Sequence, residues 1–504
     1  MTLLSVRALV RLLNTVEPVA DLPDATGVAF DSRAVRPGDA FFALPGATAH
    51  GLTFADDALA RGAALVVADR PHRRGLLVDD ARAALLALGR AARDRLTGPV
   101  VAVTGSVGKT STKAMLAAAL AARSTPGNLN THYALAKVLV DAALEDERGT
   151  GPGAPGPGAP LVLELGVDRP GEMAELVELT RPDHAVLTHV AASHLSALGD
   201  VAGVAREKTL LLDRTPGRLV VGAGAARHLH EETLARSVVV TVALAAAAGP
   251  AAGPPAHHPG ALATLAGAAR PRGQGAELTW SLAPRPDGGG TPPGRPSGAR
   301  HEQAARPTGA GALPGRVTLP WPGAGMAANA LAAIAMAELL GTAPEAAAQR
   351  VAGARLEPGR LERLALAGLT VIDDSYNSNP ASLAEAVAVL RACPPPRAAF
   401  LADMLELGAA ERSAHLAAGE LTRDLDLVVA VGPASRAITE TNPRAVHVAD
   451  AAAAARHLAS VPRGATVLIK GSRSMRMEAL VAEVTRRAAD GAWSVPPLPE
   501  GAPC

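Results

Sequence analysis

Short apolar runs that end in glycine-rich or polar turns alternate with helical patterns along most of this chain. Residues 100–103 are continuously apolar, which is typical of a strand buried on both faces of a parallel sheet, and a helical pattern follows at 114–122. Before them, 28–30 and 63–68 read as strands and 54–61 as a helix. The pattern predicts an α/β protein.

Similar runs continue to the end of the chain. Strands are expected at 161–166 and 185–190, then at 369–374, 398–403, 427–432 and 466–471, with helices between them. We predict three domains: a small N-terminal α/β domain (1–96), a central P-loop ATPase-like parallel-sheet domain (97–352) and a C-terminal doubly wound, Rossmann-like domain (353–504).

Two segments interrupt the pattern with glycine and proline. They are 149–160 and 249–315, and we interpret them as loops, the second as a low-complexity insertion. Within the second, residues 277–282 have the composition of a strand, as do residues 316–321 after it. The intervening 284–314 is expected to be disordered and is assigned no chemistry.

Composition narrows the function. With 504 residues and 48% hydrophobic content the chain can form several cores, while 49 Lys plus Arg against 48 Asp plus Glu give no basic surface for nucleic acid. Cys393 and Cys504 are the two cysteines, which fits a reducing compartment. No secretion signal or membrane-spanning run is visible, so we expect a cytoplasmic protein.

A phosphate-binding loop is the strongest chemical signal. Thr104-Gly-Ser-Val-Gly-Lys-Thr110 follows the strand at 100–103, so backbone amides would face an anion at the next helix N-terminus. Lys109 would reach the outer phosphates and Thr110 a magnesium ion. The spacing is shorter than the strict two-glycine pattern, and the alternative is a glycine turn with a chance lysine.

Other polar groups lie where strands end. Glu164 lies near the end of one strand and His189–His194 at the end of another, so both could line the same crevice as the P-loop. Taken singly, Glu164 could be a solvated loop carboxylate and His194 a structural histidine. The turn Asp31-Ser32-Arg33 could bind a diphosphate or cap a turn.

Together these motifs resemble the Mur ligase family, ATP-dependent amino-acid-adding enzymes of peptidoglycan synthesis, and within it the MurF type. The resemblance spans nearly the whole chain: Asp31-Ser-Arg, the P-loop, Gly127-Asn-Leu-Asn, Glu164-Leu-Gly, Gly359-Arg, Asp373-Asp-Ser-Tyr-Asn-Ser-Asn-Pro380, Asp403-Met-Leu-Glu-Leu-Gly and Lys470-Gly-Ser-Arg. It implies a ligase that adds D-alanyl-D-alanine to UDP-N-acetylmuramoyl-tripeptide through an acyl phosphate. It also implies a monomer.

The resemblance assigns roles residue by residue. Lys109, Glu164, His194 and Lys208 are expected to be catalytic; Thr110 and Glu164 would hold one Mg²⁺, and His194 and Lys208 a second. Lys208 stands where the family carries a carbamylated lysine, although alone it would read as a solvated surface residue. The expected ATP contacts are Thr104, Gly105, Ser106, Val107, Gly108, Lys109, Thr110, Ser111, Asn329, Arg360 and Asp374.

The same resemblance places the other substrates. Ser32, Arg33, Asn128 and Asn130 would contact the UDP-sugar peptide. The set expected to face the dipeptide or the nucleotide is Tyr376, Asn377, Asn379, Lys470, Ser472 and Arg473.

The chain departs from the family pattern at four places, one of which is Thr209-Leu-Leu after Lys208, where a Gly-Glu pair is common. Met326 replaces a usual histidine, His189 a usual asparagine, and 131–137 a segment usually rich in Asn, Gly and Pro. These departures keep two alternatives open: a divergent Mur or folylpolyglutamate-type ligase with another acceptor or amine, and a nucleotide-binding paralogue without catalysis.

Overall fold

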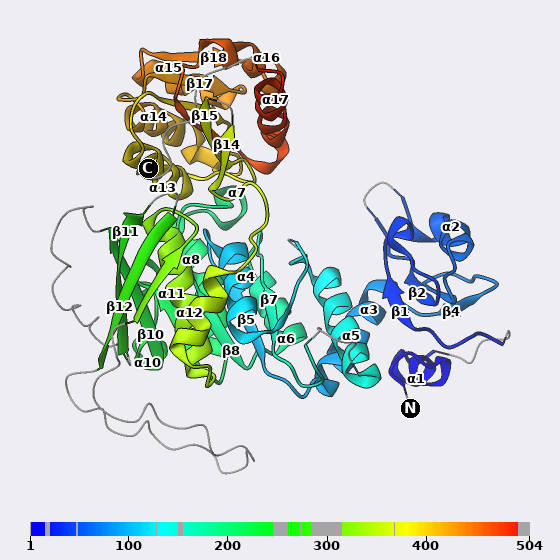
Figure 1. The fold of residues 1–504 in the computed structure, drawn as a ribbon. Helices are drawn as coiled ribbons and strands as arrows, with labels where there is room; N and C mark the ends of the chain where they lie inside the picture. The colour runs from blue at the N-terminus through cyan, green and yellow to red at the C-terminus, as the bar shows by residue number, and fades with distance from the viewer. Residues whose placement is uncertain are drawn as a thin grey trace.

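Three sheets, each covered by helices, make up the protein in the computed structural model. The structure describes residues 2–15, 21–46, 49–127, 129–149, 155–244, 261, 263–272, 275–284, 315–366 and 368–491. Figure 1 shows the N-terminal domain in blue on one side of the central domain, and the C-terminal domain, yellow to red, above it. This confirms the predicted three-domain α/β organisation.

The N-terminal domain is built on four parallel strands in the order β1-β2-β3-β4. The strands are β1 (Gly27–Ala29), β2 (Asp39–Phe42), β3 (Leu65–Ala68) and β4 (Gly75–Leu77). Its helices are α1 (Val6–Leu12), α2 (Ala55–Ala60), α3 (Ala81–Arg95) and the 3₁₀ turns η1 (Ser32–Ala34) and η2 (Gly51–Phe54).

The central sheet has nine strands in the order β13-β12-β11-β10-β9-β8-β5-β7-β6. They are β5 (Val100–Thr104), β6 (Arg123–Ser124), β7 (Leu161–Glu164), β8 (His184–Leu187), β9 (Leu219–Gly222), β10 (Ser237–Leu244), β11 (Ala263–Arg272), β12 (Gly275–Pro284) and β13 (Gly315–Leu319). All pairs are parallel except β11–β12 and β12–β13. Because β5 lies between β7 and β8, the ends of these three strands meet, as expected from the sequence.

Alternate residues of β5 enter different cores. Val100 and Ala102 pack with α3, α5 (His132–Arg148) and α6 (Glu172–Thr180). Val101 and Val103 pack with α4 (Lys109–Leu120), α11 (Ala324–Leu339) and α12 (Pro344–Ala352). This two-sided burial explains why the strand is apolar throughout. The central helices are α4 (Lys109–Leu120), α5 (His132–Arg148), α6 (Glu172–Thr180), α7 (Leu195–Leu198), α8 (Val201–Arg214), α9 (Ala223–Ala226), α10 (Glu231–Ala235), α11 (Ala324–Leu339) and α12 (Pro344–Ala352).

The C-terminal sheet has the order β14-β15-β19-β16-β17-β18, with β14 antiparallel and the others parallel. Its strands are β14 (Glu362–Leu366), β15 (Leu369–Asp374), β16 (Arg397–Ala402), β17 (Leu427–Val431), β18 (Ala445–Val448) and β19 (Thr466–Lys470). Its helices are α13 (Pro380–Ala392), α14 (Glu411–Leu421), α15 (Ile438–Thr441), α16 (Ala451–Arg456) and α17 (Glu478–Ala489), with 3₁₀ turns η3 (Gly408–Ala410), η4 (Ala434–Ala437), η5 (His457–Ser460) and η6 (Arg473–Met475).

The segment 249–315 contains more structure than its composition indicates. The strand expected at 277–282 is confirmed within β12, and the one expected at 316–321 corresponds to β13. Strand β11 was not predicted; it pairs with β10 and β12 and so extends the central sheet. Apart from Pro284, the last residue of β12, the segment expected to be disordered lies outside the described residues. No helix in the described ranges is long and apolar enough to cross a membrane.

Candidate functional site

The P-loop lies between β5 and α4, in the centre of the main sheet. Gly108 precedes the helix with φ +84°, a left-handed conformation that glycine adopts readily, and Lys109 and Thr110 fall in the first helical turn. The amide of Ser106 donates to the carbonyl of His189 at 2.7 Å, which holds the loop against the residues after β8. The helix therefore begins earlier than the apolar pattern indicated, and its N-terminal amides are of the kind that can bind an anion.

Lys109 folds back over this loop. Its Nζ donates to the carbonyl of Gly105 at 2.8 Å, and burial lowers the pKa of its ammonium despite the opposing field of Glu164. Thr104 is fully buried and donates to the carbonyl of Leu165 at 2.8 Å. Thr104 thus holds the start of the loop, and the ammonium of Lys109 lies over its backbone.

Asn329, on α11, closes the loop from the side. A Cβ on Gly108 would lie 2.4 Å from Asn329 Oδ1, so the two backbones can approach only because residue 108 is glycine. Asn329 Nδ2 lies 3.9 Å from the sulfur of Met326, the residue that replaces the usual histidine. At this position, therefore, the substitution leaves Asn329 with a weak sulfur acceptor.

Glu164, the last residue of β7, is buried beside a second lysine. Its Oε2 lies 3.6 Å from Lys113 Nζ, and each side chain is only 3% exposed. Asn130 Nδ2 approaches Oε1 at 3.4 Å. Lys113 also donates to the carbonyl of Gly127, and burial lowers the pKa of its ammonium. Lys113 was not assigned from the sequence, although its i+4 spacing from Lys109 places both on one helix face.

Lys208 lies on α8 (Val201–Arg214). Its sequence context alone predicted a solvated surface lysine, and only the family resemblance assigned it a role. The residue is fully buried, and its Nζ has no hydrogen-bond partner among the described residues. Burial, and next the charge of Lys109, lower the pKa of Lys208 to about 7. A large fraction of this amine is therefore neutral near physiological pH, which makes it a nucleophile.

His194 stands between two carboxylates. Its Nδ1 lies 2.7 Å from Glu406 Oε2, in the C-terminal domain, and 3.3 Å from Asp168 Oδ1, in the loop after β7. Burial lowers the pKa of His194, and the charges of Lys208 and Lys109 act in the same direction. The imidazole therefore shares one electrostatic environment with both lysines.

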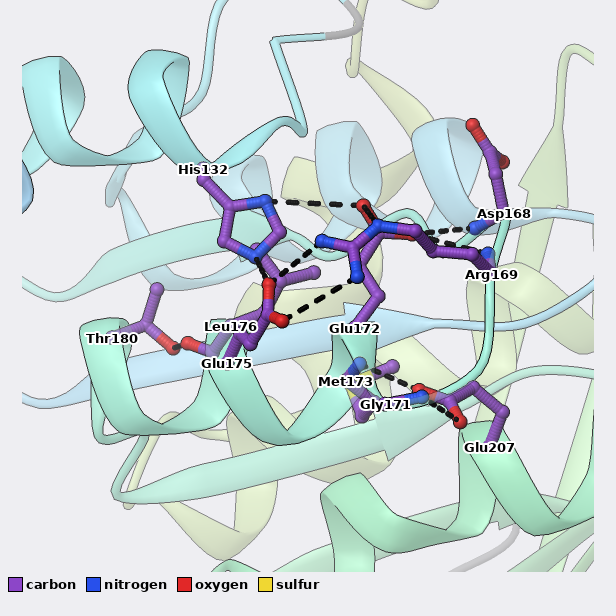
Figure 2. Close-up of polar contacts among 10 residues, drawn as sticks. All are labelled: His132, Asp168, Arg169, Gly171, Glu172, Met173, Glu175, Leu176, Thr180 and Glu207. Carbon is purple, nitrogen blue, oxygen red and sulfur yellow. Dashed lines mark hydrogen bonds and ion pairs between the residues drawn. The ribbon is translucent and has the colours of Figure 1, made fainter. Parts of the chain in front are cut away.

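The loop after β7 is held by two glutamates to which the sequence analysis assigned no role. Glu172 accepts from the amides of Asp168 and Arg169 at 2.8 and 3.3 Å, and Glu207 accepts from the amides of Gly171 and Met173 at 3.0 and 2.7 Å. Figure 2 shows both carboxylates reaching this loop. Since Glu207 directly precedes Lys208, the loop that carries Asp168 is tied to the helix that carries the buried lysine.

The departure at 131–137 meets the same loop. His132 begins α5, and its Nε2 lies 3.0 Å from Glu175 Oε2, which also pairs with Arg169 at 2.8 Å (Figure 2). Burial lowers the pKa of His132. This replaced segment is thus packed against the loop after β7. Another departure, His189, contributes its carbonyl to the P-loop rather than its side chain.

Residues of the C-terminal domain contact the P-loop of the central domain. Arg360 Nη2 donates to Thr110 Oγ1 at 2.9 Å, and its guanidinium lies 4.0 Å from the ring centroid of Tyr376. Arg473 approaches the same ring at 5.4 Å, and Asn379 Nδ2 lies 3.5 Å from the carbonyl of Ser106. Groups expected from distant motifs are therefore brought together at the P-loop.

Asp374 and Lys470 form a buried pair at the ends of β15 and β19. Lys470 Nζ lies 2.5 Å from Asp374 Oδ2 and donates to the carbonyl of Asn377 at 2.8 Å. Burial raises the pKa of Asp374 against the influence of Lys470. Ser472 Oγ accepts from the amide of Leu405 at 2.9 Å. Asp374 and Lys470 thus hold each other, whereas Ser472 fixes the turn that follows β16.

The residues expected to bind the UDP-sugar peptide are spread more widely. Ser32 is buried in η1 and its hydroxyl hydrogen-bonds to Asp57, while Arg33 pairs with Asp31 at 2.6 Å. Asn130 reaches Glu164, as described above. Asn128 lies outside the described residues. Ser32 and Arg33 thus have their contacts within the N-terminal domain.

The expected magnesium ligands can be tested by their unsatisfied atoms. Glu164 Oε2 and Lys208 Nζ are buried without hydrogen-bond partners among the described residues, as an ion-binding set would leave them. The described ranges contain no cluster of three His, Cys, Asp or Glu side chains suited to a metal. A site here would therefore require the hydroxyl of Thr110 or a modified lysine as well.

Three family profiles match the chain in order. The Mur ligase family, catalytic domain, matches residues 24–98; the Mur ligase middle domain matches 103–252; and the Mur ligase, glutamate ligase domain, matches 359–473.

Full-length relatives agree. The chain is 32% identical over 469 residues to the UDP-N-acetylmuramoyl-tripeptide–D-alanyl-D-alanine ligase of Escherichia coli (strain K12), covering 90% of this chain and 92% of that protein. It is 27% identical over 484 residues to the ligase of the same name from Bacillus subtilis (strain 168), covering 91% and 93%.

Solved structures show the same architecture. MurF from Acinetobacter baumannii superposes with a TM-score of 0.75 at 25% identity, covering 96% of this chain and 98% of that one. MurF from Thermotoga maritima, in complex with ADP, shares the fold with a TM-score of 0.70 at 24% identity, covering 92% and 98%.

Proposed function

The chain belongs to the Mur ligase family, of MurF type, and from this we propose that it joins D-alanyl-D-alanine to UDP-N-acetylmuramoyl-tripeptide at the expense of ATP. The observation that carries the proposal is the contact of Arg360 with Thr110, which brings the C-terminal domain onto the P-loop. The full-length identity to the Escherichia coli ligase supports the substrate assignment.

The reaction has two steps. A carboxylate oxygen of the tripeptide attacks the γ-phosphorus of ATP, and the bond between that phosphorus and the β,γ-bridging oxygen breaks. The products of this step are an acyl phosphate on the tripeptide and free ADP. The amine of D-alanyl-D-alanine then attacks the acyl carbon, phosphate leaves and the amine loses a proton. Phosphoryl transfer depends mainly on positioning and charge neutralisation.

The protein supplies that neutralisation at the P-loop. Lys109 and the amides at the N-terminus of α4 would bind the phosphates, and Arg360 approaches the same turn from above. Asn329 and Asp374 would contact the nucleotide. Docking of the C-terminal domain over the P-loop would exclude water, which would protect an acyl phosphate from hydrolysis.

Magnesium would neutralise the phosphate oxygens in the reaction. Thr110 and Glu164 would hold one ion and His194 and Lys208 a second. A lysine amine cannot ligate a cation when protonated, whereas a carbamate formed with carbon dioxide offers anionic oxygens. Lys208 is buried, its Nζ has no hydrogen-bond partner among the described residues, and its pKa is about 7; it therefore has the reactivity that such a modification requires.

The other substrates would bind on opposite sides of the P-loop. Ser32, Arg33, Asn128 and Asn130 would contact the UDP-sugar peptide. The side chains on the dipeptide or nucleotide side would be those of Tyr376, Asn377, Asn379, Lys470, Ser472 and Arg473. We further propose that the enzyme acts in the cytoplasm as a monomer, which light scattering after size-exclusion chromatography tests.

Phosphate release tests the function directly. ATP and Mg²⁺ are supplied with UDP-N-acetylmuramoyl-tripeptide, with and without D-alanyl-D-alanine, and products are weighed by mass spectrometry. We expect release to require both substrates and to yield a product heavier by the dipeptide. Phosphate release with another amine only would favour a divergent ligase. ATP binding without any phosphate release would favour a non-catalytic paralogue.

The role of Lys208 has its own test. Lys208→Ala is expected to abolish ligation, and bicarbonate or a short carboxylic acid to restore part of it, because a free carboxylate can occupy the place of the carbamate. Full activity of the variant would disprove the carbamate.

A further inference from the structure

One contact of His194 crosses the boundary between two domains. Glu406, in the C-terminal domain, approaches Nδ1 at 2.7 Å, closer than Asp168 of the central domain at 3.3 Å. Both are ion-pair distances, and both oxygens lie near the same ring nitrogen. Neither carboxylate has a role in the site proposed above.

The backbone around Glu406 is built to hold this contact. Leu405 donates its amide to Ser472 Oγ at 2.9 Å, and Glu406 accepts at its carbonyl from the amide of Ser196 at 3.2 Å. Ser196 belongs to α7, which begins directly after His194. Glu406 therefore contacts the α7 region through its side chain and its main chain.

The start of the same turn is anchored in its own domain. Asp403 is buried and accepts from the amide of Ser435 at 2.7 Å and from its hydroxyl at 2.6 Å. The C-terminal domain thus fixes the position of Glu406. The contact of its side chain with His194 therefore requires that this domain be docked on the central one. Figure 1 shows α7 below the C-terminal domain.

Both partners have unusual backbone conformations. His194 has φ +52° and Glu406 has φ +64°, in the left-handed region that residues other than glycine adopt at some cost. Such conformations persist where the surrounding contacts impose them, and they cluster at functional positions. Here they aim the two side chains at each other.

The chemistry of the contact is specific. An imidazole that donates Nδ1–H to a carboxylate is held as one tautomer, with its lone pair on Nε2. A histidine that binds a metal through one nitrogen commonly donates its other N–H in this way. A carboxylate in this position therefore prepares the opposite nitrogen as a ligand.

We propose that Glu406 is a positioning residue that fixes the Nδ1–H tautomer and the orientation of His194 when the C-terminal domain closes. Closure then both delivers Arg360 to the P-loop and prepares Nε2 of His194 toward the bound phosphates and cation. The proposal rests on the proposed function in one respect: that function determines which phosphates and cation Nε2 of His194 would face.

The first experiment observes the tautomer without requiring turnover. Protein labelled with ¹⁵N-histidine, carrying Asp168→Ala so that Glu406 is the remaining carboxylate, is studied by NMR with ADP and Mg²⁺. The His194 signals are identified by their loss in His194→Gln. We expect Nδ1–H in this background, its retention on adding Glu406→Gln, whose amide oxygen still accepts, and a mixed or Nε2–H state on adding Glu406→Ala.

The second experiment measures catalysis in the otherwise native chain. Glu406→Ala is expected to raise the Mg²⁺ concentration for half-maximal phosphate release about tenfold, within the about 10- to 100-fold effect typical of residues supporting a metal ligand. KM for ATP should change less than about twofold, while Glu406→Gln should stay within about threefold of the native enzyme. Glu420→Ala, in an exposed pair with Arg423, is the matched control.

The outcomes separate the proposals. An unchanged tautomer in the Glu406→Ala background would overturn the positioning role. A Glu406→Gln variant whose phosphate release is impaired as much as that of Glu406→Ala would overturn it as well. Absent ligation by the native protein would refute the proposed function instead, and the NMR comparison would still decide the role of Glu406.

Discussion

Two buried lysines near the phosphate loop have opposite environments. Lys113 has Glu164 at 3.6 Å and the carbonyl of Gly127 as an acceptor, whereas Lys208 has no hydrogen-bond partner among the described residues. Burying a charge is tolerated when it is paired and is costly when it is not. The two residues should therefore respond differently to removal of the charge.

Removing the charge at Lys208 should stabilise the unmodified protein. The folded pKa of about 7 is below the ordinary 10.5, so the unfolded chain binds more protons between these values and stability rises with pH there. The cost of the buried ammonium is complete below pH 7 and vanishes toward pH 10.5. In CO₂-free buffer, Lys208→Met should raise Tm by several degrees at pH 7, and by little near pH 10. Equal Tm values throughout would show that Lys208 is hydrated or paired.

Removing Lys113 should have the reverse effect. Lys113→Met leaves the carboxylate of Glu164 buried without its cation, which typically costs about 3 kcal/mol or more. The double variant Lys113→Met with Glu164→Gln removes both charges and should recover most of this loss. Urea unfolding of the native protein, both single variants and the double variant gives the coupling energy. Additive effects would mean that the pair contributes nothing.

Residues of this kind differ in how far the sequence reveals them. The P-loop residues follow from a local pattern, and Lys113 could have been found from its helical spacing to Lys109. Asp168 and Glu406 could not, because their contact with His194 joins separate motifs. Lys208 was identified by resemblance alone.

At the level of elements, α4 illustrates how a turn determines a helix. Its apolar pattern starts at 114, yet the helix begins at Lys109 because Gly108 permits the left-handed turn before it. The first turn carries Lys109 and Thr110, and its free amides face the site. Pattern alone predicts the helix but places its start too late.

Gly108→Ala tests this turn. The added Cβ would clash with Asn329 at 2.4 Å in addition to the cost of φ +84°. We expect calorimetry to show loss of ADP–Mg²⁺ binding by at least about tenfold, which corresponds to about 1.4 kcal/mol. Gly341→Ala is the control, since Gly341 has φ +92° but no atom within 4 Å of the new Cβ. Equal loss in both variants would attribute the effect to backbone strain alone.

For strand β11 of the central sheet, the local sequence did not even predict that the element exists. β11 contains mainly alanine and other weak strand formers, so its composition did not indicate a strand. Its pairing with β10 and β12 supplies the hydrogen bonds that define it. Strand formation in such a segment is decided by neighbours rather than by local preference.

At the scale of the whole molecule, several contacts dock the C-terminal domain on the central one. Arg360 meets Thr110, Asn379 approaches Ser106, and Glu406 meets His194. Glu385 of α13 lies against Gly325 at the start of α11, where an added Cβ would come within 2.0 Å of its Oε1, and burial raises the pKa of its carboxyl. Closure thus joins the phosphate loop, the proposed metal ligands and the nucleotide side in one arrangement.

Arg360→Ala should loosen this arrangement. It removes the hydrogen bond to Thr110 and the stacking on Tyr376, and a bond from a charged group contributes about 1.5–3 kcal/mol. We expect phosphate release to slow at least about tenfold. Small-angle scattering with ADP and Mg²⁺ should show a larger radius of gyration, whereas Arg412→Ala, in an exposed pair with Glu440, should behave as native. An unchanged radius would mean that closure does not depend on Arg360.

The sequence by itself determined the α/β class, the number of domains, the phosphate loop and, through ordered motifs, the family. These depend on local periodicity, turn chemistry and the order of short motifs. Only the tertiary structure decided that Lys113 pairs with Glu164, that Lys208 is buried with no hydrogen-bond partner in the described part of the chain, and that Glu406 reaches His194. Burial and long-range contact depend on which elements pack together, and no local pattern encodes them.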